Sequence, residues 1–316
     1  MLSLLTHRVA SLLLTLLAVS GLVFLVMNVL PGDPAAIMLG TSASPDTLAA
    51  LRHELGLDQP LLLRYFMWLV NAVRGDFGTS YVYGAPVSEL LAERLAVTLP
   101  LAAIAVVLSV TIAVPLGALS AAGRNSAFDH VVGVLSQLFI AVPGFWVALL
   151  LILLFSVRLR IMPSGGFPGW EAGLWTALKS LVLPAVALAL PQAGVLTRVT
   201  RSAVLEVLNE DYVRTARAKG LPQRVALWRH AVPNAMVPVV TILGLQFTFL
   251  VAGAILVENL FNLPGLGMLA YQALMQRDVV VLQDVVLFFA GLVVIVNFLV
   301  DLSYLFLDPR LREAAR

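Results

Sequence analysis

Apolar runs of about 20 residues recur along the chain, and they limit its fold more than any other feature. A helix of this length crosses a hydrocarbon core about 30 Å thick. The 316 residues are 60% hydrophobic and only 12% charged, and the mean hydropathy of +0.96 lies far outside the range of a soluble domain. We therefore predict an all-α polytopic membrane protein.

Six apolar runs have the length of a transmembrane helix, and several contain proline. The predicted spans are Val9–Leu30, 96–121, 131–157, 177–197, 235–257 and 280–307. The first is longer than the apolar part of a signal peptide and no cleavage site follows it, so we expect it to be retained. Prolines are tolerated inside such helices because neighbouring helices can satisfy the freed carbonyls.

The basic residues are distributed unevenly between the two sides of the predicted membrane. With the N-terminus inside, residues 1–8, 122–130, 198–234 and 308–316 hold twelve of the twenty Lys and Arg residues. Short cytoplasmic loops of membrane proteins are enriched in Lys and Arg. This distribution predicts that both termini are cytoplasmic, which requires an even number of spans.

The first external loop, 31–95, has helix signals of its own. Ser44 followed by Pro45 is typical of a helix start, and Pro60 precedes an apolar stretch of about 15 residues, LLLRYFMWLVNAVRG. That stretch is too short to span the bilayer comfortably. Two interpretations remain open: an amphipathic helix at the outer interface, or a small packed subdomain outside the membrane.

Motifs for catalysis and cofactor binding are missing from the sequence. The two lysines, Lys179 and Lys219, follow Leu178 and Ala218, so the Gly-Lys pair of a Walker A loop does not occur. The sequence contains no HExxH, no GxSxG and no cysteine. We therefore expect no enzyme activity, no catalytic residue, no cofactor site and no metal site in this chain.

Residues 211–234, DYVRTARAKGLPQRVALWRHAVPN, form a basic segment between two predicted spans. Asp211 is an acceptable N-cap for a helix beginning at Tyr212, and Gly220 suits the left-handed position after that helix. Pro222 is predicted to start a second helix that Pro233 ends. The segment is therefore predicted to be a helix, a glycine elbow and another helix.

Apolar side chains alternate with basic ones in this segment. The basic residues are Arg214, Arg217, Lys219, Arg224 and Arg229. The apolar residues are Tyr212, Val213, Leu221, Val225, Leu227 and Trp228, which are too many for a solvated loop. The residues alone leave two interpretations: a helix lying on lipid, or a peg that fits a groove on a soluble protein.

The segment resembles the EAA loop of ABC importer permeases. Gly220 is followed by nine residues and then by His230, Ala231, Val232 and Pro233, which matches the family spacing between Gly and I-x-L-P. In place of the E-A-A triplet stand Arg214, Thr215 and Ala216, a departure typical of the branch that transports dipeptides, oligopeptides and nickel. The strings VLPGDPA, ELGLDQPLLLRY, GDFGTS, VENLFNLPGLGML and DLSYLFLDPRLR also resemble that branch.

The resemblance implies a first-permease (B-type) subunit of a type I ABC importer in a bacterial inner membrane. It divides the chain into a first helix (1–30), an extracytoplasmic loop with amphipathic helices (31–95), a permease core (96–307) that contains a coupling loop (205–234), and a cytoplasmic tail (308–316). The residues expected to contact an ATPase are Asp211, Tyr212, Arg214, Thr215, Ala216, Arg217, Ala218, Lys219, Gly220, Leu221, Pro222 and Pro233.

The family also implies several partners. These are a second, related permease subunit that completes a heterodimer, two cytoplasmic ATPase subunits that bind ATP and Mg, an extracytoplasmic substrate-binding protein and the lipid bilayer. No nucleic acid is expected. The alternative from another class is a secondary carrier or channel that acts alone.

Other functional residues are less well defined by the sequence. Gln246 and Asn297 are uncharged polar residues within spans and are candidates for a translocation path, although such residues more often join helices. Trp68, Glu258, Pro264 and Gly265 are candidates for contact with the binding protein. The cargo stays open among dipeptide, oligopeptide, glutathione, nickel complex and opine.

Overall fold

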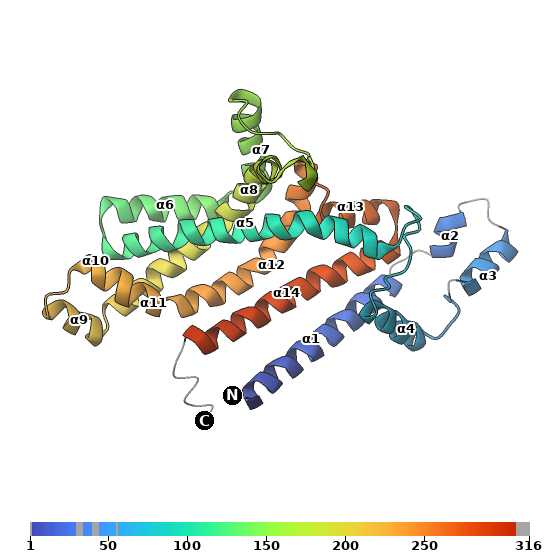
Figure 1. Cartoon of the computed structure of the whole chain (residues 1–316), viewed down its shortest axis with the longest axis horizontal. Helices are drawn as coiled ribbons and strands as arrows, with labels where there is room; N and C mark the ends of the chain where they lie inside the picture. Colours follow the sequence, from blue (N-terminus) through green and yellow to red (C-terminus); the bar gives the residue numbers. More distant parts are fainter. Residues whose placement is uncertain (1, 30–33, 40–43, 55, 308–316) are drawn as a thin grey trace. The chain divides into compact units, whose positions relative to one another are not determined.

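A computed structural model describes residues 2–29, 34–39, 44–54 and 56–307, and the predicted tail 308–316 lies outside them. The described residues are mainly helical (Figure 1). The α-helices are α1 Leu2–Val29, α2 Pro34–Leu39, α3 Pro45–Glu54, α4 Leu61–Val73, α5 Val87–Ala122, α6 Ala127–Ala141, α7 Gly144–Leu151, α8 Leu174–Leu208, α9 Asp211–Ala218, α10 Gln223–Val225, α11 Val232–Asn234, α12 Met236–Leu260, α13 Leu266–Gln276 and α14 Val279–Leu307. Two π-helical turns, η2 Ile152–Arg158 and η4 Ala226–Ala231, and a 3₁₀ turn, η3 Trp170–Ala172, complete the helical elements.

Five of the described helices are long and apolar enough to cross a membrane: α1, α5, α8, α12 and α14. Two of them, α5 and α8, contain internal prolines, as the sequence predicted. The spans begin earlier or run further than predicted, and α13, which the sequence analysis did not identify, precedes the last one.

The predicted third span, 131–157, is not one continuous helix. The chain bends by 101° between α6 and the helical run Gly144–Arg158, and Figure 1 shows α7 turning away from α6. Val142 is extended, with φ −83° and ψ 125°, because a residue that precedes proline is disfavoured in the helical region. Pro143 therefore breaks this span, whereas the prolines in α5 and α8 do not break theirs.

The chain folds into two compact units that cut across the predicted segment boundaries. The first is formed chiefly by Leu99–Leu263 and the residues from Ile295 onward, and the second by Thr6–Thr98 and Pro264–Val294. The described residues of 31–95 belong to the same compact unit as most of α1, all of α13 and the first half of α14.

Helix α8 is the centre of the first unit. In its most apolar window 72% of the residues are buried, against 17–39% in the other four long helices. Two glycines allow close approach: a Cβ on Gly117 of α5 would lie 2.7 Å from the Thr197 carbonyl oxygen, and one on Gly194 would lie 2.8 Å from the Ser136 carbonyl oxygen of α6. Thus α5 and α6 both pack directly on α8.

Helices α3 and α4 of the second unit begin where the sequence predicted. The Ser44 hydroxyl accepts a hydrogen bond from the Thr47 amide at 3.2 Å, as an N-cap does. Pro60 immediately precedes α4. Helix α4 is amphipathic.

Candidate functional site

The basic segment Asp211–Pro233 begins with α9 and turns sharply at Gly220. The Gly220 amide donates to the Arg217 carbonyl at 2.9 Å, and the Leu221 amide donates to the Ala216 carbonyl at 3.2 Å. This pair of bonds is the Schellman motif, which requires a left-handed residue after the helix. Gly220 has φ +91°, so the predicted glycine elbow is present.

The capping residues of the two arms are shifted by one position from the prediction. Glu210, with extended backbone angles, is the N-cap of α9, and Asp211 is its first helical residue. Pro222 likewise precedes α10 as its N-cap and does not begin it. Asp211 still places a negative charge at the positive end of α9, and its carboxylate lies 3.9 Å from Arg214 Nη1.

Pro233 does not end the second arm, contrary to the prediction. The arm runs through α10, the π-helical turn η4 and α11, and α12 follows after Ala235. A proline deprives a helix of one amide donor. A π-helical turn can absorb such a break, and Asn234 Nδ2 donates to the His230 carbonyl at 2.6 Å. The segment is therefore joined to α12 almost without interruption.

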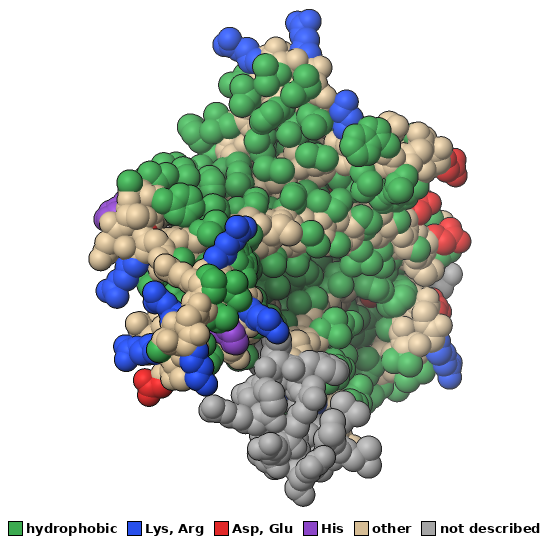
Figure 2. Space-filling view, turned by 60° about the vertical axis from the view of Figure 1, so that its left-hand side comes forward, with side chains coloured by type: hydrophobic (Ala, Val, Ile, Leu, Met, Phe, Trp, Pro, Cys, Tyr) green, Lys and Arg blue, Asp and Glu red, His purple; other side chains and the backbone are tan. Residues whose placement is uncertain are grey.

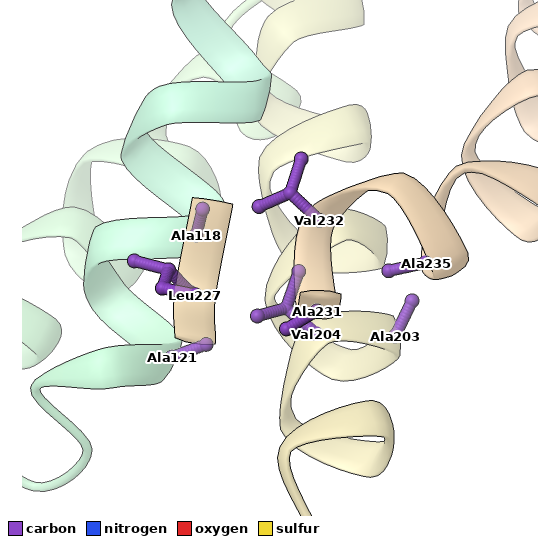
Figure 3. Packing of buried hydrophobic residues seen from close by; sticks show 8 residues of the cluster. All are labelled: Ala118, Ala121, Ala203, Val204, Leu227, Ala231, Val232 and Ala235. Carbon is purple, nitrogen blue, oxygen red and sulfur yellow. The ribbon is translucent and has the colours of Figure 1, made fainter. Parts of the chain in front are cut away.

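The base of the segment is fixed in an apolar cluster between α5 and α8 (Figure 3). The buried residues of the cluster are Ala118 and Ala121 from α5, Ala203 and Val204 from α8, and Leu227, Ala231, Val232 and Ala235. Outside the cluster, Gln223 Nε2 donates to the Ala122 carbonyl at 3.1 Å. Five of these eight cluster residues are alanines. Their small side chains allow the second arm to approach both helices closely.

The exposed side of the segment, which we call its tip, carries basic and aromatic side chains together. These are Tyr212, Arg214, Arg217, Lys219, Arg224, Trp228 and Arg229. Tyr212 is 46% exposed and Trp228 is 38% exposed. Burial and the neighbouring Glu210 carboxylate raise the pKa of the Tyr212 hydroxyl above its ordinary value. A shallow recess of about 440 Å³ is lined by Arg214, Arg217, Gly220, Leu221 and Gln223.

Figure 2 brings forward the end of the first unit that carries α9 and α10, and Lys and Arg side chains cluster on it beside apolar side chains. Of the residues predicted to contact an ATPase, Ala216 and Leu221 are partly buried. The others in 211–222, and Pro233, are exposed. Val213, between them, is fully buried and anchors α9. The segment therefore projects from the surface and is anchored by buried apolar residues at its base.

An ion pair with a buried carboxylate lies beside the segment and has no signal in the sequence. Arg201 of α8 donates to Asp129 of α6 twice, from Nε to Oδ1 at 2.6 Å and from Nη2 to Oδ2 at 2.8 Å. The Ser120 hydroxyl and the Asn125 amide also donate to this carboxylate. In the sequence, Arg201 is only one of the basic residues of 198–234 that predict the orientation. The pair joins the ends of α5, α6 and α8 from which the segment projects.

The remaining predicted site residues do not come together with the segment. Gln246 and Asn297 are partly buried on α12 and α14 of the first unit. Asn297 Oδ1 would lie 3.2 Å from a Cβ on Gly244, so this side chain borders a helix contact. A role for these two residues in translocation stays a prediction.

The proposed contacts with a binding protein fit the structure less well. Glu258 is fully buried, and Gly265 is also buried. Trp68 is partly buried, and its Nε1 donates to Asp284 Oδ1 at 3.1 Å. Glu258 and Gly265 are thus covered within this chain, whereas Trp68 and Pro264 are both partly exposed. Contact of these four residues with a binding protein stays a prediction.

Comparison with known proteins gives consistent matches along nearly the whole chain. The family model described as binding-protein-dependent transport system inner membrane component matches residues 113–313, and the model of the corresponding N-terminal part matches residues 1–102. A putative peptide transport system permease protein of Brucella abortus is 44% identical over 312 residues, which are 99% of each chain.

Two further relatives are similar over almost their full length. A probable peptide ABC transporter permease protein of Sinorhizobium fredii is 38% identical over 306 residues, 97% of this chain and 98% of the relative. The glutathione transport system permease protein GsiC of Salmonella choleraesuis is 40% identical over 312 residues, 99% of each.

Proposed function

This chain belongs to the family of binding-protein-dependent transport system inner membrane components, and on that premise we propose that Asp211–Pro233 is its ATPase-coupling element. The chain is a multi-pass membrane permease subunit of an ABC importer. The observation that carries the proposal is the division of the segment into a buried base and an exposed tip.

The proposed coupling follows from how the two ends of the segment are held. The tip presents Tyr212, Trp228 and the basic residues to a groove on a cytoplasmic ATPase. Aromatic and arginine side chains are the groups most often responsible for binding energy at interfaces. The base is packed against α5 and α8 and continues into α12. A displacement of the tip is therefore passed to three membrane helices as a rigid-body motion.

The energy for this motion comes from outside the chain. Reversing a two-state equilibrium from 1:99 to 99:1 requires about 5.5 kcal/mol of differential binding. We propose that two ATPase subunits, which bind ATP and Mg, supply most of it together with a docked substrate-binding protein. In this proposal a second permease subunit forms a heterodimer with this chain and completes the pore. This chain contributes half of the pore and one coupling segment, Asp211–Pro233.

The proposed orientation places the segment and both termini in the cytoplasm. It is supported by the twelve basic residues on the inner side of the predicted topology. Single cysteines introduced at Ala218 and at Thr79 would test it, since the chain has no native cysteine. We expect a membrane-impermeant maleimide added to intact spheroplasts to label the Thr79→Cys variant and to leave the Ala218→Cys variant unlabelled.

For the cargo we propose a small peptide. The support is that relatives 38–44% identical over nearly the full chain are named as peptide or glutathione permeases, and glutathione is itself a short peptide. The test is to identify the ligand that co-purifies with the cognate binding protein. A nickel complex or an opine in its place would contradict the proposal.

The coupling proposal is tested by replacing Gly220 with valine. A branched residue at φ +91° is strained, and about 1–2 kcal/mol is expected for a left-handed non-glycine residue. We expect the Gly220→Val importer, reconstituted in proteoliposomes, to lose uptake while the permease is still inserted. ATP hydrolysis by the assembled complex should no longer respond to the binding protein.

Gly75 provides a matched control for this variant. It follows α4 at φ +82° in the same capping motif, with the Gly75 amide bonded to the Ala72 carbonyl and the Asp76 amide to the Asn71 carbonyl. A Cβ at either glycine meets no atom within 4 Å. Gly75→Val therefore carries the same backbone cost away from the segment. Normal uptake by Gly220→Val, or equal losses in both variants, would contradict the coupling role.

A further inference from the structure

Helix α4 in the second unit is oriented opposite to an amphipathic helix of a soluble protein. None of its thirteen residues is buried, although it is strongly apolar. Two of its polar groups point inward: the Tyr65 hydroxyl lies 2.9 Å from Ser20 Oγ of α1, and Trp68 Nε1 donates to Asp284 of α14. The apolar side chains must therefore lie on the outside.

The outward face of α4 is a continuous apolar strip. Leu62, Phe66, Val70 and Val73 are spaced by three or four residues and so share one side of the helix. Their exposed fractions include 73% for Leu62, 57% for Phe66 and 82% for Val73. On the other side, the Phe24 ring of α1 packs against Tyr65 with ring centroids 5.4 Å apart.

The depth at which α4 is attached to α1 favours an apolar medium around its outward face. Its contacts on α1 are Leu17, Ser20 and Phe24, all inside the span Arg8–Asn28. Ser20 precedes the end of that span by eight residues, which is about 12 Å along a helix. The exposed side chains of α1 at this level, such as the 64% exposed Leu22, are of the kind that faces lipid.

From these observations we propose that α4 is embedded in the acyl region of one leaflet and that its Leu62–Val73 strip contacts lipid chains. Its thirteen residues extend about 20 Å, too short to cross a core of about 30 Å. The helix lies against α1 and its apolar strip continues the lipid-facing surface of α1. Its C-terminal carbonyls are satisfied by the Gly75 motif, as a helix end in an apolar medium requires.

The proposal rests on the proposed function in one respect only. If the Asp211–Pro233 segment is cytoplasmic, the leaflet that holds α4 is the outer one. The proposal also explains why the inward face holds polar groups. Phenol, indole and hydroxyl groups at this depth find partners on the inward face, because lipid offers no hydrogen-bond partner. Of the Asp284 carboxyl group, Oδ1 accepts from Trp68 and Oδ2 has no hydrogen-bond partner.

Spin labels in the complete importer, reconstituted in nanodiscs with its ATPases and binding protein, test the proposal. Single-cysteine variants Phe66→Cys and Val70→Cys are compared with Leu22→Cys on α1 and with Thr79→Cys in the exposed polar turn of the same unit. Collision rates are measured with oxygen, which concentrates in lipid, and with a neutral nickel chelate, which concentrates in water.

We expect labels at positions 66 and 70 to match position 22, with collisions frequent for oxygen and several-fold rarer for the chelate than at position 79. Chelate access equal to that of position 79 would overturn the proposal in favour of an aqueous surface. Low access to both reagents would overturn it in favour of a protein partner that covers the strip. Neither reading depends on ATP or cargo, so failure here is distinct from failure of the coupling proposal.

Discussion

Arg201 of α8 forms a two-bond fork with Asp129 of α6, with donor–acceptor distances of 2.6 and 2.8 Å. Asp129 is buried and Arg201 is partly exposed. Removing Arg201 leaves the Asp129 carboxylate with only the Ser120 and Asn125 donors. The cost is therefore expected to be less than the roughly 3–5 kcal/mol of a fully buried pair. We predict that Arg201→Ala lowers the thermal stability of the permease by several degrees, measured by fluorescence-detected size exclusion.

A conservative variant separates charge from geometry at this pair. Arg201→Lys keeps the charge and loses the planar fork, so we expect an intermediate loss of stability. The pair lies beside the coupling segment, so we also expect Arg201→Lys to lower the amount of cargo taken up per ATP hydrolysed. This loss should be present at temperatures where the variant is still fully folded. An Arg201→Ala permease as stable as the wild type would show that the pair contributes nothing to the fold.

Gly117 is predicted to be the helix-contact glycine least tolerant of a methyl group. A Cβ there would lie 2.7 Å from both the Thr197 carbonyl oxygen and Thr200 Cβ, so Gly117→Ala must separate α5 from α8 at a cost of about 1–3 kcal/mol. Gly133→Ala on α6 is the control, because its Cβ meets no atom within 4 Å. That change should be neutral or stabilising by up to about 1 kcal/mol. Equal melting temperatures for the two variants would refute the close contact.

Trp228 is predicted to contribute to ATPase binding and little to folding, since its side chain is substantially exposed. Truncation of an aromatic interface residue often costs about 2 kcal/mol, which is roughly a 30-fold weaker Kd. We expect Trp228→Ala to weaken binding of the purified ATPase by about that factor while the melting temperature is unchanged. Trp175→Ala, at an exposed position near the start of α8, should leave the Kd as it is.

Trp68 is predicted to stabilise the second unit through Asp284. Trp68→Phe removes the indole donor and leaves a fully buried carboxyl group, which costs about 1–3 kcal/mol. Replacing both partners, in Trp68→Phe with Asp284→Leu, should recover part of the stability because no polar group is then left unpaired. A double variant less stable than Trp68→Phe alone would contradict this pairing.

The features predicted correctly from the sequence are those set by local chemistry. Apolar length identified the spanning helices, and the Gly220 elbow followed from a helix that must end in a left-handed residue. Ser44 is recognisable as an N-cap because its hydroxyl can accept a bond from an otherwise unpaired amide of the first helical turn. Each depends only on residues within a few positions along the chain.

The features that were missed depend on contacts between distant residues. Asp129 and Arg201 are 72 positions apart, and neither belongs to a motif. Pro143 breaks its helix whereas Pro233 is absorbed by a π-helical turn, a difference that depends on surrounding packing. The bond from Trp68 to the buried Asp284 joins residues 216 positions apart, so it too has no local signal in the sequence.

The central claim is that an ATPase holds the tip of the Asp211–Pro233 segment, and site-specific photocrosslinking tests it most directly. Tyr212 is replaced by the aromatic photoprobe p-benzoylphenylalanine, and the complete importer is irradiated in its membrane during ATP turnover. The account predicts a covalent adduct with the ATPase subunit, and no such adduct when the probe replaces Trp175. Adducts with lipid alone, or an unlinked permease in an importer that is transporting cargo, would contradict the account.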